Sequence, residues 1–371
     1  MVTHLSYSDD VVDGGIATAV RGLIAAQQSA GLSPQWLTAD SFFPQRRDRD
    51  LLALAQASAP RLIHVHGLWR SPTRICHQLA RDGLPIVIAP HGMLDSGALA
   101  ISRHKKQFAW RLWEKRALQA ASCLHALCPA EALAIRALLP GAPIAVIPNG
   151  VELPRTMDSS VNPLLPSTLW AEVIPLGAPV LLFFGRFHSK KGLEPLLKAW
   201  QSVARVAERS GWWLALVGYG DNGSLQRHVQ AAQSRGELPQ VFVGGPVFGT
   251  HKSAVLRDAC AFVLPSFSEG LPMAALEAMA HQLPCLLSSA CNLPEAFIAG
   301  AAMPAEPRPD DLSEALYKLF SLSEVERGHM GAAGRALVDE HYSWSQVAAQ
   351  TKKLYHWCLC GGEPPAFLQL G

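Results

Sequence analysis

The sequence Pro265-Ser-Phe-Ser-Glu-Gly-Leu-Pro-Met-Ala-Ala-Leu-Glu-Ala-Met-Ala280 holds two glutamates, Glu269 and Glu277, in a largely apolar segment. The preceding Ala261–Leu264 is typical of a short buried strand, and Pro272 stands where proline is preferred, at the first helical position. We therefore expect a loop with Glu269 just before a helix and Glu277 between one and two turns inside it. An unpaired carboxylate on so apolar a helix would cost several kcal/mol. The sequence therefore predicts a partner for Glu277.

The spacing of the two glutamates suggests what binds between them. At a rise of about 1.5 Å per residue the carboxylates are roughly 10 Å apart, about the span from a sugar ring to the ribose of a nucleotide diphosphate sugar. The free amides of the first helical turn, at Gly270, Leu271 and Met273, are suited to bind a diphosphate. The alternative is a solvated helix glutamate and an unrelated loop acid.

The pattern Pro-Ser-x2-Glu-Gly-x6-Glu-Ala-Met-Ala resembles the signature of retaining glycosyltransferase family 4, which has the GT-B fold, and the likeness covers nearly the whole chain. Upstream, Phe184-Gly-Arg-Phe-His-Ser-Lys-Lys-Gly192 resembles the family's Gly-Arg…Lys-Gly segment. Its basic residues hold the donor diphosphate, which implies this role for Arg186 and Lys191. The resemblance also implies that Glu269 touches the donor sugar hydroxyls and Glu277 the ribose hydroxyls.

Further residues of the second half enter through the same resemblance. Asn292-Leu-Pro-Glu295 resembles the loop that ends in another family glutamate, so Glu295 is expected to support the site. The donor base is expected to meet backbone atoms around Gly245 to Val247. Backbone recognition carries no side-chain code, so the base, the sugar, the acceptor and the linkage are not readable from the sequence.

Length and composition favour a two-domain enzyme. A chain of 371 residues predicts about two domains, and 49% hydrophobic residues suffice for two cores. The formal net charge of +2 gives no general case for binding nucleic acid. No apolar stretch approaches 18 residues, and the first ten show no secretory signal. The eight cysteines lack a Cys-x-x-Cys pair, so we expect reduced, buried thiols in a cytoplasmic protein.

Apolar strand candidates alternate with helix-length segments in both halves, which predicts α/β parallel sheets covered on both faces. The candidates are residues 2–5, 62–65, 86–89, 123–127 and 144–147, then 180–184, 213–217, 241–243, 261–264 and 285–287. The first candidate is short, which predicts that Met1 lies a few residues inside the true first strand.

The resemblance implies two Rossmann-like domains facing a cleft. We expect an acceptor-side domain at 1–160, a nucleotide-sugar domain at 161–342, and a crossover helix with a tail at 343–371. The Pro- and Ser-rich stretch 151–178 is expected to be the hinge. Apolar residues at helical spacing in 343–359 predict the helix that returns to the first domain, and the tail from Gly361 is expected to be poorly ordered.

A competing motif, Gly218-Tyr-Gly-Asp-Asn-Gly223, fits G-x-G-x-x-G and follows a strand, as in NAD-binding oxidoreductases. That class needs an acidic residue about 20 positions on, at the end of the next strand. No acid closely follows Val241–Val243, and the preceding strand is not the first of its domain. The milder interpretation is that Gly218 and Gly220 let the backbone pass close to a donor nucleotide.

The first half supplies three further candidates. Gly14 and Gly15, ahead of a helix from Ile16, resemble the family's glycine loop, where amides approach the donor phosphate or the acceptor; an ordinary tight turn is the alternative. His91 follows a strand and matches a family position near the donor sugar. His66 follows another strand and resembles an acceptor-side residue. A purely structural histidine is the alternative for both.

The resemblance implies a mechanism without a metal or other cofactor. The leaving phosphate takes the acceptor proton while a sugar cation is shielded, and Arg186 and Lys191 stabilise the departing diphosphate. Together with His91 and Glu269 they are the expected catalytic residues of a metal-independent, retaining hexosyltransferase.

Residues 101–120 carry six basic side chains and one acidic, interleaved with Trp110 and Trp113. This pattern is as compatible with peripheral contact with an anionic membrane face and a lipid-linked glycan acceptor as with a solvated helix face and an acceptor loop. We expect a role in surface polysaccharide biosynthesis. The alternatives are a nucleotide-sugar epimerase or hydrolase of the same fold, an NAD-binding oxidoreductase and a non-catalytic sugar-binding relic.

Overall fold

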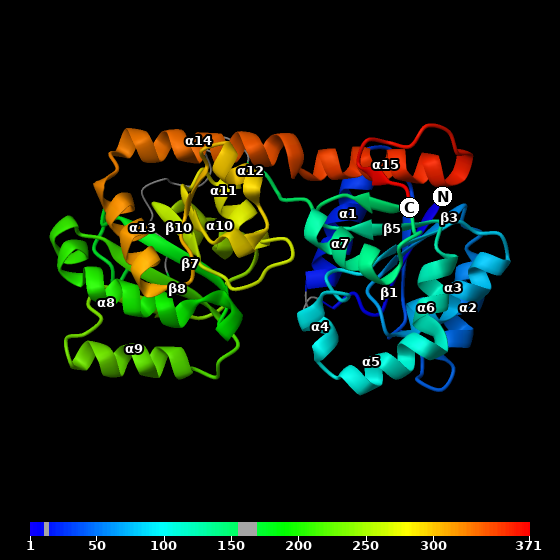
Figure 1. Ribbon diagram of the computed structural model, residues 1–371, viewed down its shortest axis with the longest axis horizontal. Helices are drawn as coiled ribbons and strands as arrows, with labels where there is room; N and C mark the ends of the chain where they lie inside the picture. The colour runs from blue at the N-terminus through cyan, green and yellow to red at the C-terminus, as the bar shows by residue number, and fades with distance from the viewer. Residues whose placement is uncertain (11–14, 155–168) are drawn as a thin grey trace. The chain divides into compact units, whose positions relative to one another are not determined.

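The computed structural model describes residues 1–10, 15–154 and 169–371. The chain divides into two compact units (Figure 1). Unit 1 contains Met1–Gly150 and Tyr342–Gly371, and unit 2 contains Val151–His341. The expected boundary at residues 160 and 161 lies outside the described residues.

Unit 1 is built on a seven-stranded sheet with the order β13-β6-β5-β4-β3-β1-β2. All its pairs are parallel except β13 with β6. The strands are β1 (Val2–Ser6), β2 (Pro34–Thr38), β3 (Leu62–His66), β4 (Ile86–Ala89), β5 (Cys123–Ala126), β6 (Ile144–Val146) and β13 (Leu368–Gln369).

Helices cover both faces of this sheet. The helices are α1 (Gly15–Ser29), α2 (Arg47–Ala57), α3 (Ser71–Arg81), α4 (Ser96–Ala100), α5 (Arg103–Ala109), α6 (Lys115–Ala120), α7 (Pro129–Leu138) and α15 (Trp344–Cys360), with a π-helical turn at Trp110–Glu114. Alternate strand residues serve opposite faces, as a pleated sheet requires. Ile63 and Val65 pack in one core with α2 and α3, whereas Leu62 packs in the other with α1 and α15.

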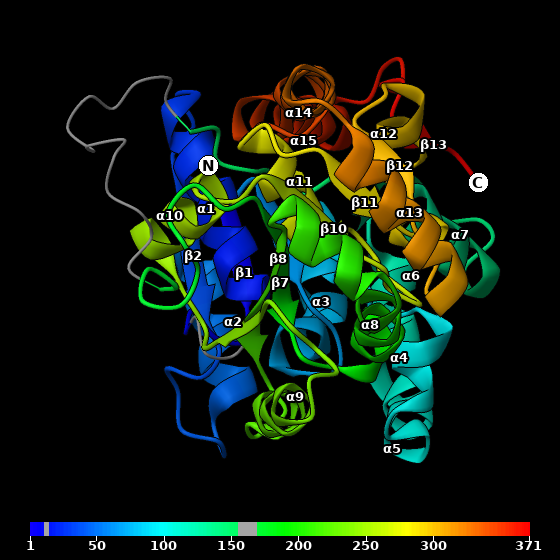
Figure 2. The same cartoon turned by 90° about the vertical axis from the view of Figure 1, so that its left-hand side faces the viewer.

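Unit 2 is built on a six-stranded parallel sheet with the order β12-β11-β10-β7-β8-β9. Its strands are β7 (Val180–Arg186), β8 (Trp213–Tyr219), β9 (Val241–Gly244), β10 (Ala261–Leu264), β11 (Cys285–Leu287) and β12 (Ala302–Pro304). Its helices are α8 (Leu193–Ser210), α9 (Ser224–Ser234), α10 (Gly249–Arg257), α11 (Met273–Ala280), α12 (Pro294–Ile298), α13 (Pro309–Ser321) and α14 (Glu324–His341). Helices α8 and α13 lie side by side (Figures 1 and 2). The fully buried Trp200 of α8 meets Phe320 of α13 edge-on.

The C-terminal helix α15 belongs to unit 1, where it lies beside α1 (Figure 1). Its first residue, Trp344, fills a slot made by two glycines. A Cβ on Gly22 would lie 2.1 Å from the indole and one on Gly150 would lie 2.3 Å from it. The predicted return of this helix to the first domain is therefore confirmed, as are the two parallel-sheet α/β domains.

Some sequence expectations need correction. The strands β2, β12 and β13 were not predicted, because β2 carries proline and glutamine and the other two are very short. The tail is not wholly irregular, since Leu368 of β13 pairs with Ala145 and is only 8% exposed. The eight cysteines are free, but Cys360 is exposed rather than buried.

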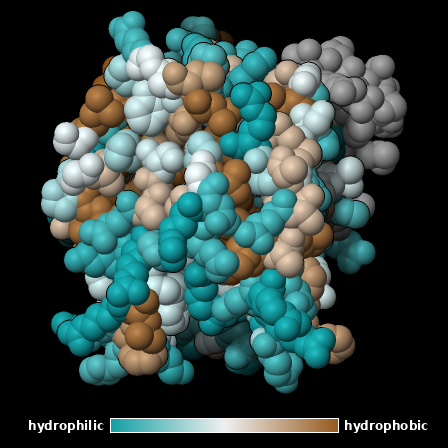
Figure 3. Space-filling view, turned by 90° about the vertical axis from the view of Figure 1, so that its right-hand side faces the viewer, coloured by the Kyte–Doolittle hydropathy of each residue, from teal (hydrophilic) through white to brown (hydrophobic). Residues whose placement is uncertain are grey.

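Two surface features bear on the membrane question. None of the helices in the described part of the chain combines the length and apolar character needed to cross a membrane. The face of unit 1 seen in Figure 3 mixes hydrophilic residues with small hydrophobic spots.

Candidate active site

In unit 2, the loops that follow three neighbouring strands are joined at the carboxyl edge of the sheet. After β7 the chain makes a 3-10 turn at Ser189–Lys191 and reaches Gly192, whose φ of +70° favours glycine. A Cβ on Gly192 would lie 1.9 Å from the carbonyl oxygen of Pro265 in the loop after β10. The amide of Phe267 donates to the carbonyl of Lys190 at 2.7 Å. The missing side chain therefore lets the two loops touch along their backbones.

Glu269 lies at the centre of this junction. Its Oε1 is 2.6 Å from Nζ of Lys191 and accepts a hydrogen bond from Ser266 Oγ at 2.5 Å. The loop after β11 holds its backbone: its amide donates to the carbonyl of Ala290 at 3.0 Å, and Asn292 Nδ2 donates to its carbonyl at 2.6 Å. Only 10% of the Glu269 side chain is exposed. Two of the loops therefore hold the carboxylate of Glu269, and the third holds its backbone.

Glu277 has a partner that the sequence did not reveal. It lies inside α11, as predicted, and its Oε1 is 2.7 Å from Nζ of Lys252 on α10. The side chain is 22% exposed. Helix α11 is apolar because Ala275, Leu276 and the residues from 278 to 280 are buried, whereas Glu277 follows a less buried stripe. The expected cost of an unpaired carboxylate therefore does not arise.

The other expected donor-binding residues lie on the same edge of unit 2. Arg186 ends β7, is exposed, and has no hydrogen-bond or ion-pair partner among the described residues. The amides of Gly270 and Leu271 donate no hydrogen bond to any residue that the structure describes. Met273 begins α11. Val247 is half-buried in the loop after β9.

Gly218 has a packing reason to be glycine. A Cβ there would lie 1.8 Å from the carbonyl oxygen of Gly185 on β7 and 2.9 Å from the ring of Phe187. Asp221 accepts hydrogen bonds from the amides of Gly223 and Leu225, at 3.2 and 2.5 Å, and so holds the turn into α9. The glycine motif is therefore explained by the contact between β7 and β8 and by a helix start.

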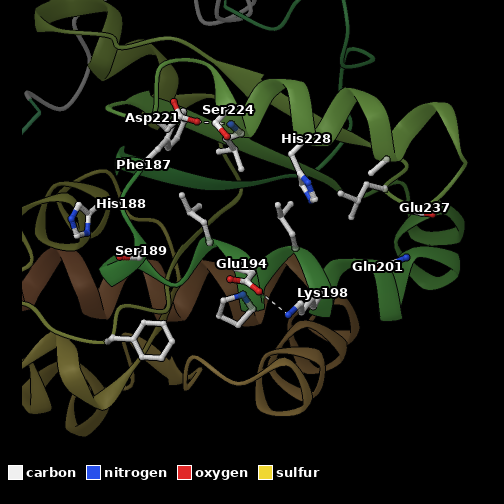
Figure 4. A pocket seen from close by; sticks show the side chains of 17 residues that line it. Phe187, His188, Ser189, Glu194, Lys198, Gln201, Asp221, Ser224, His228 and Glu237 are labelled. Carbon is white, nitrogen blue, oxygen red and sulfur yellow. Dashed lines mark hydrogen bonds and ion pairs between the residues drawn. The ribbon is translucent and has the colours of Figure 1, made fainter.

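A cavity in unit 2 is lined in part by the loops after β7, β8 and β10. It measures about 690 Å³ and lies between α8 and α9, next to Phe187 and Phe267 (Figure 4). His228 of α9 points into it, and the ion pair of Glu194 with Lys198 lies on the α8 side (Figure 4). None of the residues expected from the sequence to bind the donor lines this cavity.

In unit 1, Gly14 lies outside the described residues, and Gly15 begins α1. A Cβ on Gly15 would meet nothing within 4 Å, so packing does not require glycine there. A small cavity of about 140 Å³ lies at the carboxyl ends of β1 and β3 and is lined by His66, among others. Arg70, which also lines it, lies 3.9 Å above the ring of Tyr7.

His91 lies in a tight turn after β4 with a φ of +54°. A buried carboxylate fixes this turn: Glu131 of α7 accepts hydrogen bonds from the amide of Gly92 at 2.5 Å and from that of Leu127 at 2.7 Å. Burial raises the pKa of Glu131 to about 7, against these two hydrogen bonds, which lower it. His91 is half-buried, and its Nε2 lies 3.1 Å from Nδ1 of His66. The structure thus brings the two predicted histidines together.

His66 itself is buried and already bonded at both ring nitrogens. Its Nε2 lies 2.9 Å from Nδ1 of His4, and the ring of His64 lies 4.2 Å away, tilted by 35°. Burial and the neighbouring histidines lower the pKa of His66 well below its usual value. An acceptor would have to displace one of these bonds to reach a ring nitrogen.

The basic segment 101–120 lines one part of a cavity of about 480 Å³, with Arg103, Lys106 and Trp110, and Trp69 lines another part. Its π-helical turn at Trp110–Glu114 is of the kind often found at functional sites. The buried Glu114 accepts from the amide of Trp69 at 2.9 Å and from Thr73 at 3.0 Å, and burial raises its pKa to about 7.

The two parallel-sheet α/β units have the architecture of the GT-B fold class. Residues 178–321 match the family described as glycosyl transferases group 1, and residues 36–150 match the glycosyl transferase 4-like domain. Both halves of this chain therefore match glycosyltransferase families.

Curated relatives span most of the chain. Alpha-maltose-1-phosphate synthase of Mycolicibacterium smegmatis is 26% identical over 326 residues, which cover 82% of this chain and 81% of that protein. D-inositol 3-phosphate glycosyltransferase 2 of Catenulispora acidiphila is 28% identical over 309 residues, covering 79% and 70%. Both names are those of enzymes that act on sugars.

Solved structures show the same fold. Sucrose-phosphate synthase of Thermosynechococcus elongatus has a TM-score of 0.69 at 19% identity, covering 97% of this chain and 100% of that one. Anabaena HepE, solved in complex with UDP, has a TM-score of 0.71 at 16% identity, covering 95% and 98%. At these identities the likeness is evidence for the fold alone.

Sequence reasoning missed several residues of the site. Lys252 and Glu131 carry no local motif, and Ser266 lies in the Pro-Ser-x2-Glu-Gly pattern but was given no role; each contacts a predicted residue or its loop. The exposed rings of Tyr219, at the end of β8, and Phe248, in the loop after β9, lie 6.5 Å apart and were also missed.

Proposed function

We propose that this chain is a retaining hexosyltransferase that moves a sugar from a nucleotide diphosphate sugar to a glycan or lipid-linked glycan. The observation that carries the proposal is the junction at the edge of unit 2. There Lys191 and Glu269 form an ion pair at 2.6 Å, and the exposed Arg186 ends the strand from which that loop departs. Cations beside a fixed carboxylate suit a ligand that joins a diphosphate to a polyhydroxylated ring.

Each group has a role in this account. The Nζ of Lys191 has three hydrogens, one of which serves Glu269, so the others remain for a phosphate. Arg186 and the amides of Gly270 and Leu271 add further donors. Glu269 accepts from the sugar hydroxyls, and Glu277 accepts from the ribose while Lys252 orients it.

The chemistry follows from these roles. The bond between the anomeric carbon and the diphosphate oxygen breaks, and the acceptor oxygen bonds to that carbon on the same face. The departing phosphate oxygen takes the acceptor proton. Arg186 and Lys191 stabilise the charge that grows on the leaving group, which is the electrostatic task that a metal performs elsewhere. We therefore expect a metal-independent reaction.

The test is thermal unfolding with UDP, GDP, ADP, TDP and NAD at equal concentrations. A ligand at about 100 times its dissociation constant adds about 2.7 kcal/mol, a shift of a few degrees. We expect one nucleoside diphosphate to stabilise the protein and Glu277→Ala to abolish the effect. Stabilisation by NAD alone would contradict the proposal, as would silence across the panel.

A nucleotide-sugar epimerase or hydrolase of the same fold is the second candidate, because the same edge would serve it. That enzyme consumes its donor without an acceptor, so donor consumption measured with no acceptor separates the two. An NAD-binding oxidoreductase has less support, because Gly218 lies within β8, the second strand of unit 2, and is explained by its contact with Gly185.

For the acceptor, we infer contact between segment 101–120 and the anionic inner face of a membrane, in surface polysaccharide biosynthesis in the cytoplasm. The support is the exposure of large apolar residues among the basic ones: Ile101 is 65% exposed, Phe108 65% and Leu112 51%. Apolar side chains flanked by lysine and arginine suit the lipid interface.

Flotation with vesicles containing acidic lipids tests this contact. We expect binding that is lost in Phe108→Ser/Leu112→Ser. It should be kept in Leu133→Ser, the matched control, because Leu133 is 72% exposed on α7 outside the segment. Equal loss in both variants, or no flotation of the unchanged protein, would exclude the membrane contact.

A further inference from the structure

A continuous chain of seven hydrogen bonds runs through unit 1 between the sheet and the helices α1 and α15. It joins His91 Nε2 to His66 Nδ1 (3.1 Å), His66 Nε2 to His4 Nδ1 (2.9 Å), His4 Nε2 to Gln27 Oε1 (2.9 Å), Gln27 Nε2 to Tyr355 OH (3.0 Å), Tyr355 OH to His64 Nδ1 (2.7 Å), His64 Nε2 to His125 Nδ1 (3.2 Å) and His125 Nε2 to the carbonyl oxygen of Ile147 (2.7 Å). All members but His91 are at most 3% exposed.

The five histidines of this hydrogen-bond chain are neutral at pH 7. Burial is the main cause in every case. It lowers the pKa of His4 and His125 to about 4 and that of His91 to about 3. The pKa values of His64 and His66 are likewise lowered well below 6.5, with repulsion from neighbouring histidines adding to burial. Each ring therefore carries one hydrogen and one lone pair.

The end of the hydrogen-bond chain at Ile147 fixes the direction of the three bonds closest to it. A carbonyl oxygen only accepts, so Nε2 of His125 carries its hydrogen and Nδ1 accepts. Nε2 of His64 must then donate to His125, which leaves Nδ1 of His64 as an acceptor. The hydroxyl of Tyr355 must therefore donate its single hydrogen to Nδ1 of His64. Its oxygen can then only accept from the next group.

That requirement fixes the rest of the chain. Only the amide nitrogen of Gln27 can donate to Tyr355, so Oε1 of Gln27 faces His4 and accepts from its Nε2. His4 Nδ1 then accepts from His66, and His66 Nδ1 accepts from His91. Every bond has one donor and one acceptor, and no other assignment of neutral groups satisfies all seven.

We propose that this chain fixes His91 as the Nε2–H tautomer, with Nδ1 as a lone-pair acceptor, and that Tyr355 on α15 is the positioning residue that sets it. Thr351 helps to hold the Gln27 amide in the same orientation. Its hydroxyl donates to the carbonyl of Ala348 at 3.0 Å and accepts from Nε2 of Gln27 at 3.4 Å. Two hydroxyls of α15 thus hold the Gln27 amide in one orientation.

The same accounting argues against a metal ion at His4, His64 and His66. Their ring nitrogens come within 4.8 Å of one another, as in a three-histidine site. However, all six of these nitrogens already take part in the chain's hydrogen bonds. A metal would have to break the bonds that orient Gln27 and Tyr355.

The tautomer limits what His91 can recognise. Among the described residues none hydrogen-bonds to Nδ1 of His91, and a lone pair there accepts from an O–H or N–H group but repels an ionised phosphate oxygen. His91 would therefore meet a sugar hydroxyl and not the diphosphate. This consequence rests on the proposed transferase function, whereas the tautomer itself does not.

The test is two-bond 1H–15N correlation of ring signals in the full-length protein labelled with 15N-histidine at pH 7.5. Loss of a signal set in His91→Gln assigns that ring. We expect a protonated Nε2 and an unprotonated Nδ1 for His91. Finding the hydrogen on Nδ1 in the unchanged protein would overturn the proposal, whatever the activity assays show.

The positioning role is tested with Tyr355→Phe/Thr351→Val, and Thr351→Val alone is the matched control. Without both hydroxyls the Gln27 amide is free to turn, so the 15N shifts of His4, His66 and His91 should become averages of two tautomers. His125 should stay unchanged, because Ile147 still fixes it. An unchanged His91 in the folded double variant would refute the role of Tyr355. If that variant does not fold, Gln27→Met, which removes the amide, should produce the same averaging at His91.

Discussion

Lys191 and Glu269 are partly withdrawn from water, with 22% and 10% of their side chains exposed. At such a site the loss of one partner leaves an incompletely compensated charge, so stability and function must be separated. Ser266 remains to bond Glu269 if the lysine is removed. A second substitution that removes the charge of Glu269 therefore separates the loss of stability from the loss of function.

We predict that Lys191→Ala lowers kcat/KM roughly 100-fold or more, because a donor to the leaving diphosphate is lost. Unfolding free energy should fall by about 1 to 3 kcal/mol, because Glu269 loses its cation. Adding Glu269→Gln should restore stability but not turnover. Steady-state kinetics and denaturant unfolding of both variants check this, and unchanged turnover would remove Arg186 and Lys191 from the proposed role.

At the residue scale, the sequence predicted positions better than partners. The loop before a helix put Glu269 in place, but its ion pair joins residues 78 positions apart. Lys252 was equally invisible from Glu277. A period of two places His64 and His66 on one sheet face, yet the bonds that orient them come from β1, the turn after β4, β5 and α15.

The strands and loops carry the next level of organisation. Apolar runs predicted β3, β4, β10 and β11 closely, because buried parallel strands are nearly continuous hydrophobic segments. They did not predict how the loops after those strands would be joined. That depends on a backbone contact, between Gly192 and Pro265, which no hydrophobic pattern encodes.

We predict that Gly192→Ala destabilises more than Gly236→Ala. Both glycines have φ near +70°, with values of +70° and +74°, so both variants lose about 1 to 2 kcal/mol to backbone strain. Only at Gly192 would the Cβ also meet backbone, the carbonyl of Pro265, which adds roughly 1 to 3 kcal/mol. Denaturant unfolding and nucleotide affinity check this. Equal losses in the two variants would show that the loop contact is unimportant.

On the scale of the whole chain, the sequence predicted two parallel-sheet domains and a helix returning to the first. The buried ionisable groups of unit 1 were not predictable, because burial depends on the packing of both helix layers. Five histidines with lowered pKa values and two carboxyl groups with raised ones, Glu114 and Glu131, oppose each other in their effect on stability against pH.

We predict that stability falls as the pH drops from 6.5 towards 5. In this range the histidines become protonated in the unfolded state but stay neutral in the folded state. The unfolded state therefore binds more protons and is favoured as the pH falls. Glu114 and Glu131 act in the opposite sense, since they hold protons only in the folded state. The histidines outnumber them, so the net slope should be about two to three protons.

Denaturant unfolding at pH 7.5, 6.5, 5.5 and 5.0 measures this slope. Glu131→Gln should steepen it, because one opposing group is removed, whereas His4→Gln should make it shallower. Stability that stays level or rises towards pH 5 would contradict the neutral histidine chain.

The most direct test of the proposed donor site is calorimetric titration with the nucleoside diphosphate that stabilises the protein most. Lys191→Ala tests the edge of unit 2, and Lys198→Ala tests the cavity of about 690 Å³ between α8 and α9. Lys198 lines that cavity and its side chain is 61% exposed. Lys191→Ala should weaken binding by about tenfold or more, whereas Lys198→Ala should change it by less than about twofold. The opposite result, weak binding in Lys198→Ala and unchanged binding in Lys191→Ala, would place the nucleotide in the other cavity and contradict the account.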